Sequence, residues 1–199
     1  MEFVNAFKNI PAAVVSDSQV RSGAMDAGIR ALDTAMTVVG RALTCACAPG
    51  DNLMLHKAVA QAQPGDVLVV SATMDCSMLG ELMALCCQKR GIAGLVIDGC
   101  VRDSLDLIRM GFPVFCRGTH PKAPRRQIRG TLGCPVLCGG VTVCTGDLVV
   151  ADADGVVAVR AGEEAEVLEK ATAKLAREEA LRSQLEAGRT TWELFGLGK

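Results

Sequence analysis

Three charged residues with a characteristic spacing are the strongest candidates for chemistry in this chain of 199 residues: Glu81, Arg102 and Asp103. Twenty residues separate Glu81 from Arg102. A guanidinium can hold a carboxylate or an oxyanion through a forked contact, and one carboxylate with waters and a chelating substrate is a common Mg²⁺ arrangement. Each residue alone has a simpler explanation, a surface ion pair for Arg102 and complementation of a helix dipole for the two acids. Together they favour a site for an anion and a metal.

The secondary structure predicted around these residues explains why the spacing matters. A short apolar strand covers 66–72, a helix begins close to Glu81 and ends at Gly91, and a second strand covers 92–98. The helix of such a crossover runs antiparallel to both strands, so its first turn lies beside the carboxyl end of the next strand. We therefore expect Glu81, the Arg102–Asp103 pair and the helix N-terminus to meet where open α/β sheets bind ligands. The residues predicted to form the apolar face of this helix are Leu79, Leu82, Met83, Cys86 and Cys87.

Several other groups are candidates for attracting an anion. The backbone amides of Leu82 and Met83, at the helix start, are potential donors. A run of basic residues lies between positions 122 and 129. Its simplest interpretation is a solvated loop, and the alternative is a surface that attracts a dianionic substrate. His56 is interpreted as a packed or surface histidine, and His120 as a loop residue. The basic run consists of Lys122, Arg125, Arg126 and Arg129.

Composition narrows the class of protein. Half of the residues are hydrophobic, which predicts one folded domain with a helical appendage. The net charge of −1, the absence of Tyr and the single Trp argue against a nucleic-acid partner. No apolar run is long enough to span a bilayer, and the start Met1–Asn5 lacks the pattern of a secretion signal. We expect a cytoplasmic protein with no membrane partner.

The ten cysteines do not form a metal-binding or disulfide pattern. No Cys-x-x-Cys pair occurs, and only two histidines are present, so a zinc tetrad has little support. Most of the cysteines lie within apolar runs. They are predicted to be buried free thiols in a reducing compartment.

The remaining elements follow from turn signals and hydrophobic periodicity. Residues 12–35 are predicted to be mostly helical, with Ser16–Ser18 capping a helix before Val20. The charged helix over 163–187 has a narrow apolar stripe, so we expect it and the tail Trp192–Phe195 to pack on a neighbouring subunit. The other predictions are a strand over 38–48, a helix over 52–62, a helix over 103–110, a strand over 113–117 and a β-meander over 136–159.

An ordered series of motifs resembles a known family over roughly residues 12–190. The family is that of 4-hydroxy-4-methyl-2-oxoglutarate aldolases, which also contains the RraA-type regulators of ribonuclease E activity. The motifs are Pro64–Val70, Gly80-Glu81-Leu82-Met83, Asp98–Asp103, Gly111–Phe115 and Gly139–Asp147.

The resemblance implies both a fold and an activity. The fold is a compact α/β domain related to swivelling β/β/α domains over 1–162, with a C-terminal helix and tail over 163–199 that pack on a neighbour, in trimers or dimers of trimers. The activity is class II aldol cleavage of a 4-hydroxy-2-oxo acid that releases pyruvate, with oxaloacetate decarboxylation as a companion reaction. Both pass through a pyruvate enolate stabilised by a divalent metal, Mg²⁺ or Mn²⁺. The alternative is a non-catalytic RraA-type regulator that binds and inhibits a ribonuclease.

The resemblance also implies residue roles. Asp103 helps to hold the metal, Arg102 contacts the pyruvate oxygens, and the helix start from Gly80 to Met83 binds the carboxylate. Glu81 takes an acidic position at which the family often has Asp, and it orders metal-bound waters. A glutamate from the C-terminal helix of a neighbouring subunit completes the site. The spacing Glu178-x-x-x-Arg182 favours Glu178, with Glu179 as the alternative.

Overall fold

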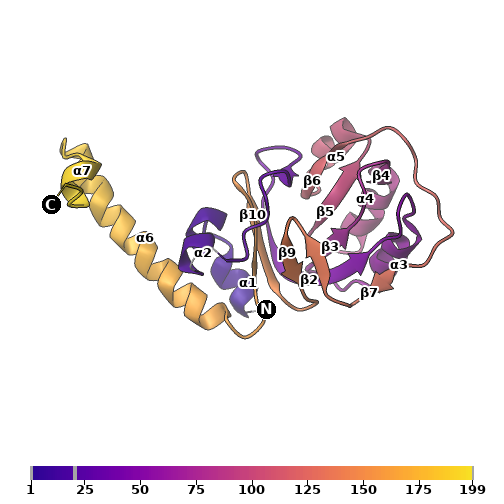
Figure 1. Cartoon of the computed structure of the whole chain (residues 1–199), viewed down its shortest axis with the longest axis horizontal. Coiled ribbons are helices and arrows are strands. Elements are labelled where there is room, and N and C mark those ends of the chain that lie inside the picture. Colours follow the sequence, from indigo (N-terminus) through magenta and orange to yellow (C-terminus); the bar gives the residue numbers. More distant parts are fainter. Residues whose placement is uncertain (1, 20–21, 199) are drawn as a thin grey trace.

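The computed structural model describes residues 2–19 and 22–198. A mixed β-sheet in the order β1-β6-β5-β3-β2-β10-β11 lies at its centre, with β4 added to β5 and β7 to β2 (Figure 1). The strands are β1 Arg30–Ala31, β2 Val38–Ala46, β3 Asp66–Ser71, β4 Ser77–Leu79, β5 Gly94–Val101, β6 Val114–Thr119, β7 Thr131–Leu132, β8 Val136–Cys138, β9 Val141–Val143, β10 Leu148–Asp152 and β11 Gly155–Val159. The helices are α1 Glu2–Phe7, α2 Ala12–Ser18, α3 Leu53–Gln61, α4 Glu81–Lys89, α5 Ser104–Met110, α6 Glu164–Glu186 and α7 Thr191–Leu194.

The sheet is nearly closed on itself. Parallel pairing links β2, β3, β5 and β6, and the antiparallel hairpin β10–β11 extends the sheet beyond β2. The segment after α2 reaches both edges, because β1 pairs with β6 while Ala24 forms a bridge to Val157 of β11. This arrangement is a mixed α/β fold with a C-terminal helix, as the sequence predicts.

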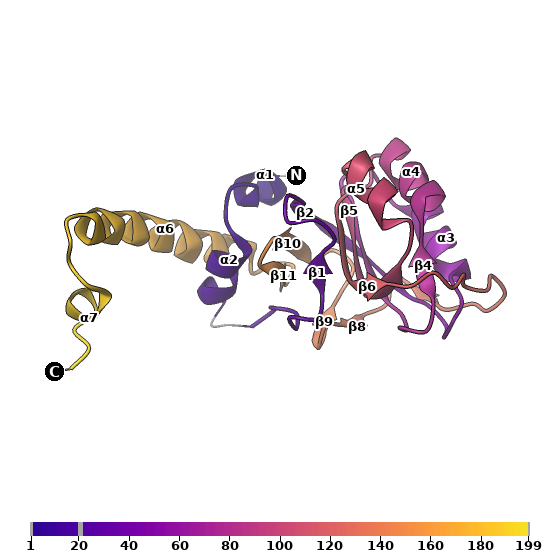
Figure 2. The same ribbon diagram turned by 90° about the horizontal axis from the view of Figure 1, so that it is seen from above.

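Alternate residues of β3 show how the layers form. Leu68 and Val70 belong to a core with residues of α3, α4 and α5, which lie together beside the parallel strands (Figures 1 and 2). Val67 and Val69 belong to a second core, which the hairpin β8–β9 covers. Both faces of the strand are buried, so its sequence is continuously apolar instead of alternating.

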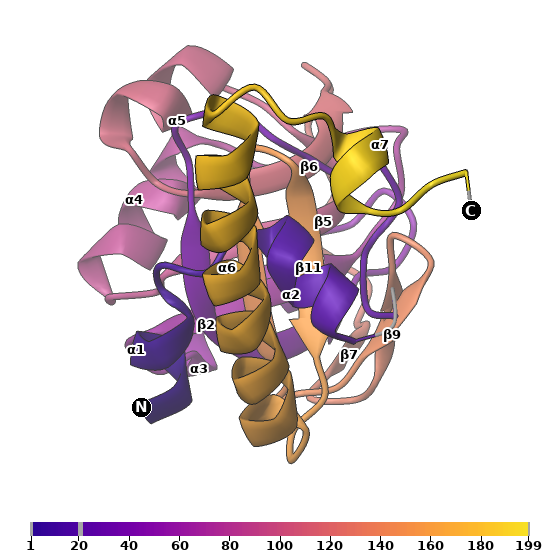
Figure 3. The same cartoon turned by 90° about the vertical axis from the view of Figure 1, so that its left-hand side faces the viewer.

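Helix α6 is divided into an anchored half and a projecting half. Its first half packs on the chain's own α1 and α2, where Val167 and Ala171 share a buried core with Phe7 (Figures 1 and 3). The buried Glu164 fixes the helix start, because its carboxylate accepts hydrogen bonds from Arg41 and, at 2.7 Å, from the Gly162 amide. The chain's own core thus accounts for the apolar residues of this half, and packing of the helix on a neighbouring subunit stays a prediction. The second half extends away from the body and leads to α7 (Figure 1).

The prediction of a mostly helical segment over 12–35 is wrong beyond Ser18. Ser16–Ser18 form the last turn of α2 and do not cap a following helix, and Val20 lies outside the described residues. After Ser22 the chain is extended or turning, and the Met25 amide donates to the Val156 carbonyl at 2.9 Å. Backbone pairing with both sheet edges outweighs the local helical preference of an Ala-rich stretch.

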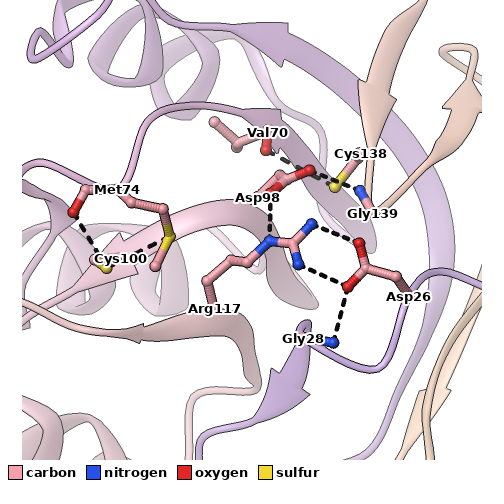
Figure 4. Close-up of polar contacts among 9 residues, drawn as sticks. All are labelled: Asp26, Gly28, Val70, Met74, Asp98, Cys100, Arg117, Cys138 and Gly139. Carbon is pink, nitrogen blue, oxygen red and sulfur yellow. Dashed lines mark hydrogen bonds and ion pairs between the residues drawn. The ribbon is translucent and has the colours of Figure 1, made fainter.

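An ion cluster centred on Arg117 of β6 holds this segment in place (Figure 4). Its guanidinium binds Asp26 through two contacts of 2.6 Å and Asp98 of β5 through a third, also of 2.6 Å. The other Asp98 oxygen accepts from the Gly139 amide at 2.8 Å, in the turn of the β8–β9 hairpin. Hydrogen bonds from Arg117 and Gly28 lower the pKa of Asp26. Asp98, which belongs to the same motif as Arg102, therefore joins three segments: β6, the β8–β9 hairpin and, through Arg117, the segment after α2.

The other predicted elements agree with the structure to within three residues at each end. Helix α5 ends at Gly111, which takes the left-handed conformation (φ 64°) that favours glycine. The Asp154–Gly155 turn joins β10 to β11 in a hairpin. Five short elements of the described chain escape sequence analysis: α1, β1, β4, β7 and α7.

Most cysteines are buried thiols, as predicted. Cys45, Cys76, Cys87, Cys100, Cys116 and Cys138 are buried, Cys47 is half-buried, and Cys86, Cys134 and Cys144 are exposed. Burial raises the pKa of Cys87 and of Cys138 to about 12, so these thiols are neutral near pH 7. None of the described helices is long and apolar enough to cross a membrane. A cytoplasmic location stays a prediction.

Candidate functional site

The candidate site forms where two neighbouring strands end. Strand β4 lies beside β5, with Leu79 paired to Val101, and the Arg102 amide donates to the Leu79 carbonyl at 2.9 Å. Helix α4 begins directly after β4, with Gly80 as its N-cap. The Gly80–Glu81 and Arg102–Asp103 segments therefore meet at the carboxyl edge of the sheet. The predicted convergence is correct, although the short strand β4, which the sequence did not reveal, produces it.

Asp103 has an unusual backbone and an unexpected partner. It is the one non-glycine residue within the described ranges that has a positive φ, at 57° with ψ 40°. It is the N-cap of α5, yet its side chain does not cap that helix. Oδ2 instead accepts the Glu81 amide of α4 at 3.0 Å, and it lies 3.6 Å from Nε of Arg102. The left-handed conformation costs about 1–3 kcal/mol and marks the residue as a candidate for function.

Gly80 is required by this close approach. A Cβ atom at Gly80 would lie 2.4 Å from Oδ2 of Asp103 and 3.1 Å from Cγ of Arg102, so no larger residue fits without movement. As an N-cap without a side chain, Gly80 cannot cap α4 itself, and Asp103 accepts the amide of Glu81 in its place. The amides of Leu82 and Met83 have no partner within the helix either, because they belong to its first turn. An anion is the natural acceptor for such a helix start.

A cavity of about 450 Å³ connects these residues to the groove between α3 and α4. Arg102 and Asp103 belong to its lining, with side chains 38% and 40% exposed, so a ligand can reach both. The prediction of an apolar face that includes Leu82 and Cys86 is wrong, because both are exposed and line this cavity. The charged and polar residues of the lining include Asn52, His56, Arg90, Arg102, Asp103 and Arg126.

The segment that carries the basic run is fixed over this cavity by Asp51. The Asp51 side chain is buried, and Oδ2 accepts the amides of Gln127 at 2.6 Å and Ile128 at 3.1 Å. Burial opposes its charged form, but these bonds and one from the Leu53 amide outweigh burial and lower its pKa. The basic run is therefore an anchored segment, and not simply the solvated loop that the sequence suggests. Of its four cations, Arg126 lines the cavity.

The two histidines differ in their surroundings. His56 lines the cavity, and burial together with the charge of Arg126 lowers its pKa. His120 is a loop residue, as expected, and its Nδ1 accepts the Lys122 amide at 3.0 Å. The sequence did not identify Asp51 or Asn52 as site residues. Their position directly after the Pro49–Gly50 turn and before a predicted helix was the available signal.

The donor set suits a hydrated Mg²⁺ or Mn²⁺ better than a metal bound mainly by protein. No cluster of three or more His, Cys, Asp or Glu side chains with metal-binding geometry occurs in the described part of the chain. Asp103 offers a carboxylate at the start of α4, where its Oδ2 accepts the backbone amide of Glu81, and Mg²⁺ is commonly held by one or two carboxylates, waters and substrate oxygens. The residues present therefore fit a divalent cation that keeps several waters.

Glu178 lies far from the other candidates in the same chain. It belongs to α6, whereas the cavity lies beside α3 and α4 on the far side of the sheet (Figure 1). Its carboxylate pairs with Lys174 at 2.7 Å, and Lys174 also contacts Asp17 of α2 at 3.1 Å. Glu179 pairs with Arg182 at 3.5 Å. Neither glutamate can reach the cavity of its own chain.

The fold and the site define an α/β protein that can hold a small anion between a helix start and an arginine, beside a carboxylate. The sequence matches the RraA-like family, described as Aldolase/RraA, over residues 12–158, and the chain belongs to this family. A relative from Halalkalibacterium halodurans is 40% identical over 182 residues, which cover 90% of this chain and 87% of the relative. That relative carries the provisional name 4-hydroxy-4-methyl-2-oxoglutarate aldolase.

Solved structures show the same fold. An uncharacterised protein from Pseudomonas syringae pv. tomato has a TM-score of 0.87 at 28% identity, with 95% of this chain and 90% of that chain covered. RraAS2 of Streptomyces coelicolor, described as an unusual member of the RNase ES inhibitor RraA family, has a TM-score of 0.80 at 32% identity. In that comparison 91% of this chain and 96% of that chain are covered. The family thus includes proteins named for two different functions.

Proposed function

We propose that this protein is a divalent-metal-dependent class II aldolase, a carbon–carbon lyase that cleaves a 4-hydroxy-2-oxo acid and releases pyruvate, and that it also decarboxylates oxaloacetate. The observation that carries the proposal is the convergence of the α4 start, Arg102 and Asp103 in the lining of one cavity. The name of the H. halodurans relative agrees with this assignment.

The helix start and Arg102 bind and orient the pyruvyl part of the substrate. The amides of Leu82 and Met83 donate to its carboxylate, which also interacts favourably with the helix dipole. The planar guanidinium of Arg102 donates to the pyruvyl oxygens. In aldol cleavage a water of the site takes the proton of the C4 hydroxyl, C4 becomes a carbonyl carbon, and the electron pair of the C3–C4 bond forms the double bond between C2 and C3, so negative charge develops on the C2 oxygen. In oxaloacetate the same bond breaks and C4 leaves as CO₂, and in both reactions protonation of C3 then gives pyruvate. Donors already fixed at that oxygen stabilise the transition state without reorganisation.

Asp103 and Glu81 would hold the cation, which supplies Lewis-acid stabilisation of the developing charge. Asp103 would be the ligand from the protein, because its left-handed backbone and its bond to the Glu81 amide fix its carboxylate at the helix start. Glu81 is half-buried in the first turn of α4 and orders the waters of the site. Nε of Arg102 lies 3.6 Å from Oδ2 of Asp103, so the guanidinium and the proposed cation ligand are neighbours.

The substrate is cleaved or decarboxylated to pyruvate, so pyruvate release is the direct test. We expect turnover of 4-hydroxy-2-oxo acids and of oxaloacetate with Mg²⁺ or Mn²⁺, and loss of turnover in EDTA that either metal restores. A lactate dehydrogenase-coupled assay measures the release, with the coupling enzyme checked separately in EDTA. Turnover that persists undiminished in EDTA would contradict the role of the metal.

A glutamate of a neighbouring copy completes the proposed site, in a homotrimer or a dimer of trimers. Glu178 is the first choice and Glu179 the alternative, since both lie on the projecting half of α6. Three exposed apolar side chains near the end of the chain also suit a subunit contact: Trp192 at 63%, Phe195 at 57% and Leu197 at 50%. The neighbour would thus cover an apolar surface and supply a carboxylate.

Removing residues 178–199 tests this shared site. The shortened chain keeps Val167, Ala171 and the Lys174–Asp17 pair, so its own core is preserved. We expect it to sediment as a smaller species than the full-length protein and to lose pyruvate release. Glu178→Gln and Glu179→Gln, compared as a pair, identify which carboxylate acts. A full-length protein that is active as a monomer would exclude the shared site.

A regulatory function is a second candidate, because the likeness to RraAS2 extends over nearly the whole chain. An RraA-type regulator binds and inhibits a ribonuclease, and this function needs neither the metal nor Arg102. Inhibition of a ribonuclease by an Asp103→Asn variant without aldolase activity would favour this second function.

A further inference from the structure

We infer that Cys45 and Cys47 form a second metal site, which holds one soft monovalent cation, Cu⁺, between two thiolates. The two residues are separated by Ala46 at the end of β2, so their side chains lie on the same side of the extended chain. Their sulfur atoms are 3.9 Å apart. This site does not depend on the aldolase assignment, because its donors are soft sulfurs and not the hard oxygens that Mg²⁺ or Mn²⁺ requires.

The distance between the two sulfurs fits two bonds to one metal ion. With metal–thiolate bonds of about 2.3 Å, two sulfurs on one metal lie about 3.8 Å apart at a tetrahedral angle and about 4.6 Å apart in a linear arrangement. The observed 3.9 Å lies within this range. A disulfide would instead need the sulfurs at about 2.05 Å. Metal binding therefore requires less movement of the two side chains than oxidation does.

The backbone around the two cysteines is held from both sides, which keeps the sulfurs at this separation. Cys45 is paired with Val70 of β3 on one side and with Leu132 of β7 on the other. The Cys47 amide donates to the Ser71 carbonyl at 2.9 Å. Closing the gap to a disulfide would bend a strand that has neighbours along both edges, whereas a bound cation leaves the strand in place.

One of the two thiols is already favoured as a thiolate, the form that binds metals. The hydrogen bond with Cys45 and another from the Leu55 amide lower the pKa of Cys47, against burial and the charge of Asp51. Leu55 belongs to the first turn of α3, so the positive end of that helix lies at the sulfur. The hydrogen bond with Cys47 and burial raise the pKa of Cys45, which remains the donor. Binding of the cation releases the Cys45 proton to solvent, and the charge of the ion itself does not change.

The number of donors selects a cation that needs few ligands. Among the residues that the structure describes, no third His, Cys, Asp or Glu side chain joins the pair in a metal-binding cluster. Asp51 is the charged neighbour, but its Oδ1 accepts the Leu53 amide at 2.9 Å and its Oδ2 accepts the amides of Gln127 and Ile128. Its charge attracts a cation without supplying a ligand. Zn²⁺ takes four ligands, whereas Cu⁺ prefers soft thiolates and is satisfied by two.

The difference in burial sets the order in which the two sulfurs bind. Cys45 is fully buried in the core that β2 shares with Leu55 of α3, and Cys47 is half-buried at the edge of that core (Figure 1). An incoming ion therefore meets Cys47 first, and Cys45 completes the pair. Once bound, the ion is shielded from water and from competing ligands.

Competition for Cu⁺ tests the site in the full-length protein. The reduced protein is titrated with Cu⁺ under argon against a chromophoric chelator, bathocuproine disulfonate. We expect one tightly held ion per chain, which excess Mg²⁺ does not displace and whose X-ray absorption spectrum shows two sulfur ligands. Cys45→Ser and Cys47→Ser should each weaken the binding of this ion by about 10²–10⁴-fold, because a chelating pair becomes a single ligand.

Cys138→Ser is the matched control. Cys138 is also a buried cysteine, but its sulfur donates to the Val70 carbonyl at 3.8 Å and makes no hydrogen bond with another sulfur among the described residues. This variant should keep the Cu⁺ affinity of the wild-type protein. Cys47→Ser decides the outcome if Cys45→Ser fails to fold, because Cys47 is half-buried and serine is accommodated there more readily. Thermal unfolding of each variant shows whether the fold is kept.

Two results would overturn the site. The first is equal Cu⁺ affinity of the wild-type protein and Cys47→Ser, or a bound ion without two sulfur ligands. The second is oxidation in place of metal binding. Trypsin releases residues 42–57, which contain Cys45 and Cys47 and no other cysteine. If hydrogen peroxide makes this peptide lighter by two hydrogens, while the reduced protein fails to compete for Cu⁺, then the two cysteines are a redox pair and not a metal site.

Discussion

Replacing Asp103 by asparagine is expected to lower pyruvate release by about 10²–10³-fold, because the cation supplies several kcal/mol of transition-state stabilisation and would lose its direct ligand. Asparagine tolerates the left-handed backbone at this position. Its side-chain oxygen can also still accept the Glu81 amide, which Asp103 binds at 3.0 Å. The fold should therefore be kept while the charge is lost.

Two measurements accompany this variant. Calorimetry with Mn²⁺ should show weakened metal binding, and thermal unfolding should show an unchanged transition. Asp106→Asn is the matched control, since Asp106 is an exposed aspartate of α5 that pairs with Arg109 and does not line the cavity formed by the described residues. Full activity of Asp103→Asn, with metal binding intact, would show that Asp103 is not the metal ligand.

The second large effect is expected for Arg102→Lys. The substitution keeps the positive charge but replaces a planar fork of donors with a single flexible ammonium group. If Arg102 stabilises the charge on the C2 oxygen, kcat should fall by about 10²–10³-fold, as it does when one oxyanion donor is removed elsewhere. KM should change much less, because the α4 amides still bind the carboxylate.

The division between kcat and KM decides the role of Arg102. A rise in KM with kcat unchanged would mean that Arg102 binds ground state and transition state equally. Arg109→Lys is the control: Arg109 lies on the neighbouring helix α5 and has a side chain that is 75% exposed. This control should leave both constants unchanged.

The local sequence predicted the elements of the site well because their signals are local. A continuous apolar run identified β3, and Gly91 and Gly111 marked the ends of α4 and α5. The chain direction in a crossover then placed Glu81 near Arg102 and Asp103. These inferences need only periodicity, turn residues and the geometry of parallel strands, which are properties of neighbouring residues.

Other features depended on contacts between distant residues. The segment after α2 has a helical composition, yet it is held extended by Arg117 and by pairing with the edges of the sheet. Exposure of Leu82 follows from which side of α4 packs on the sheet, and the pattern of apolar residues did not reveal it. Such outcomes are set by tertiary packing, which overrides local preference.

The sequence by itself thus determined the residue types of the site and their order along the chain, because chemistry and secondary structure are encoded locally. The tertiary structure alone decided that Asp103 binds the start of α4 instead of capping α5, and that Gly80 leaves the space for it. It also decided that Arg126 is the member of the basic run that reaches the cavity, because the buried Asp51 fixes that segment from 76 residues away. Long-range hydrogen bonds of this kind have no periodic signature in a sequence.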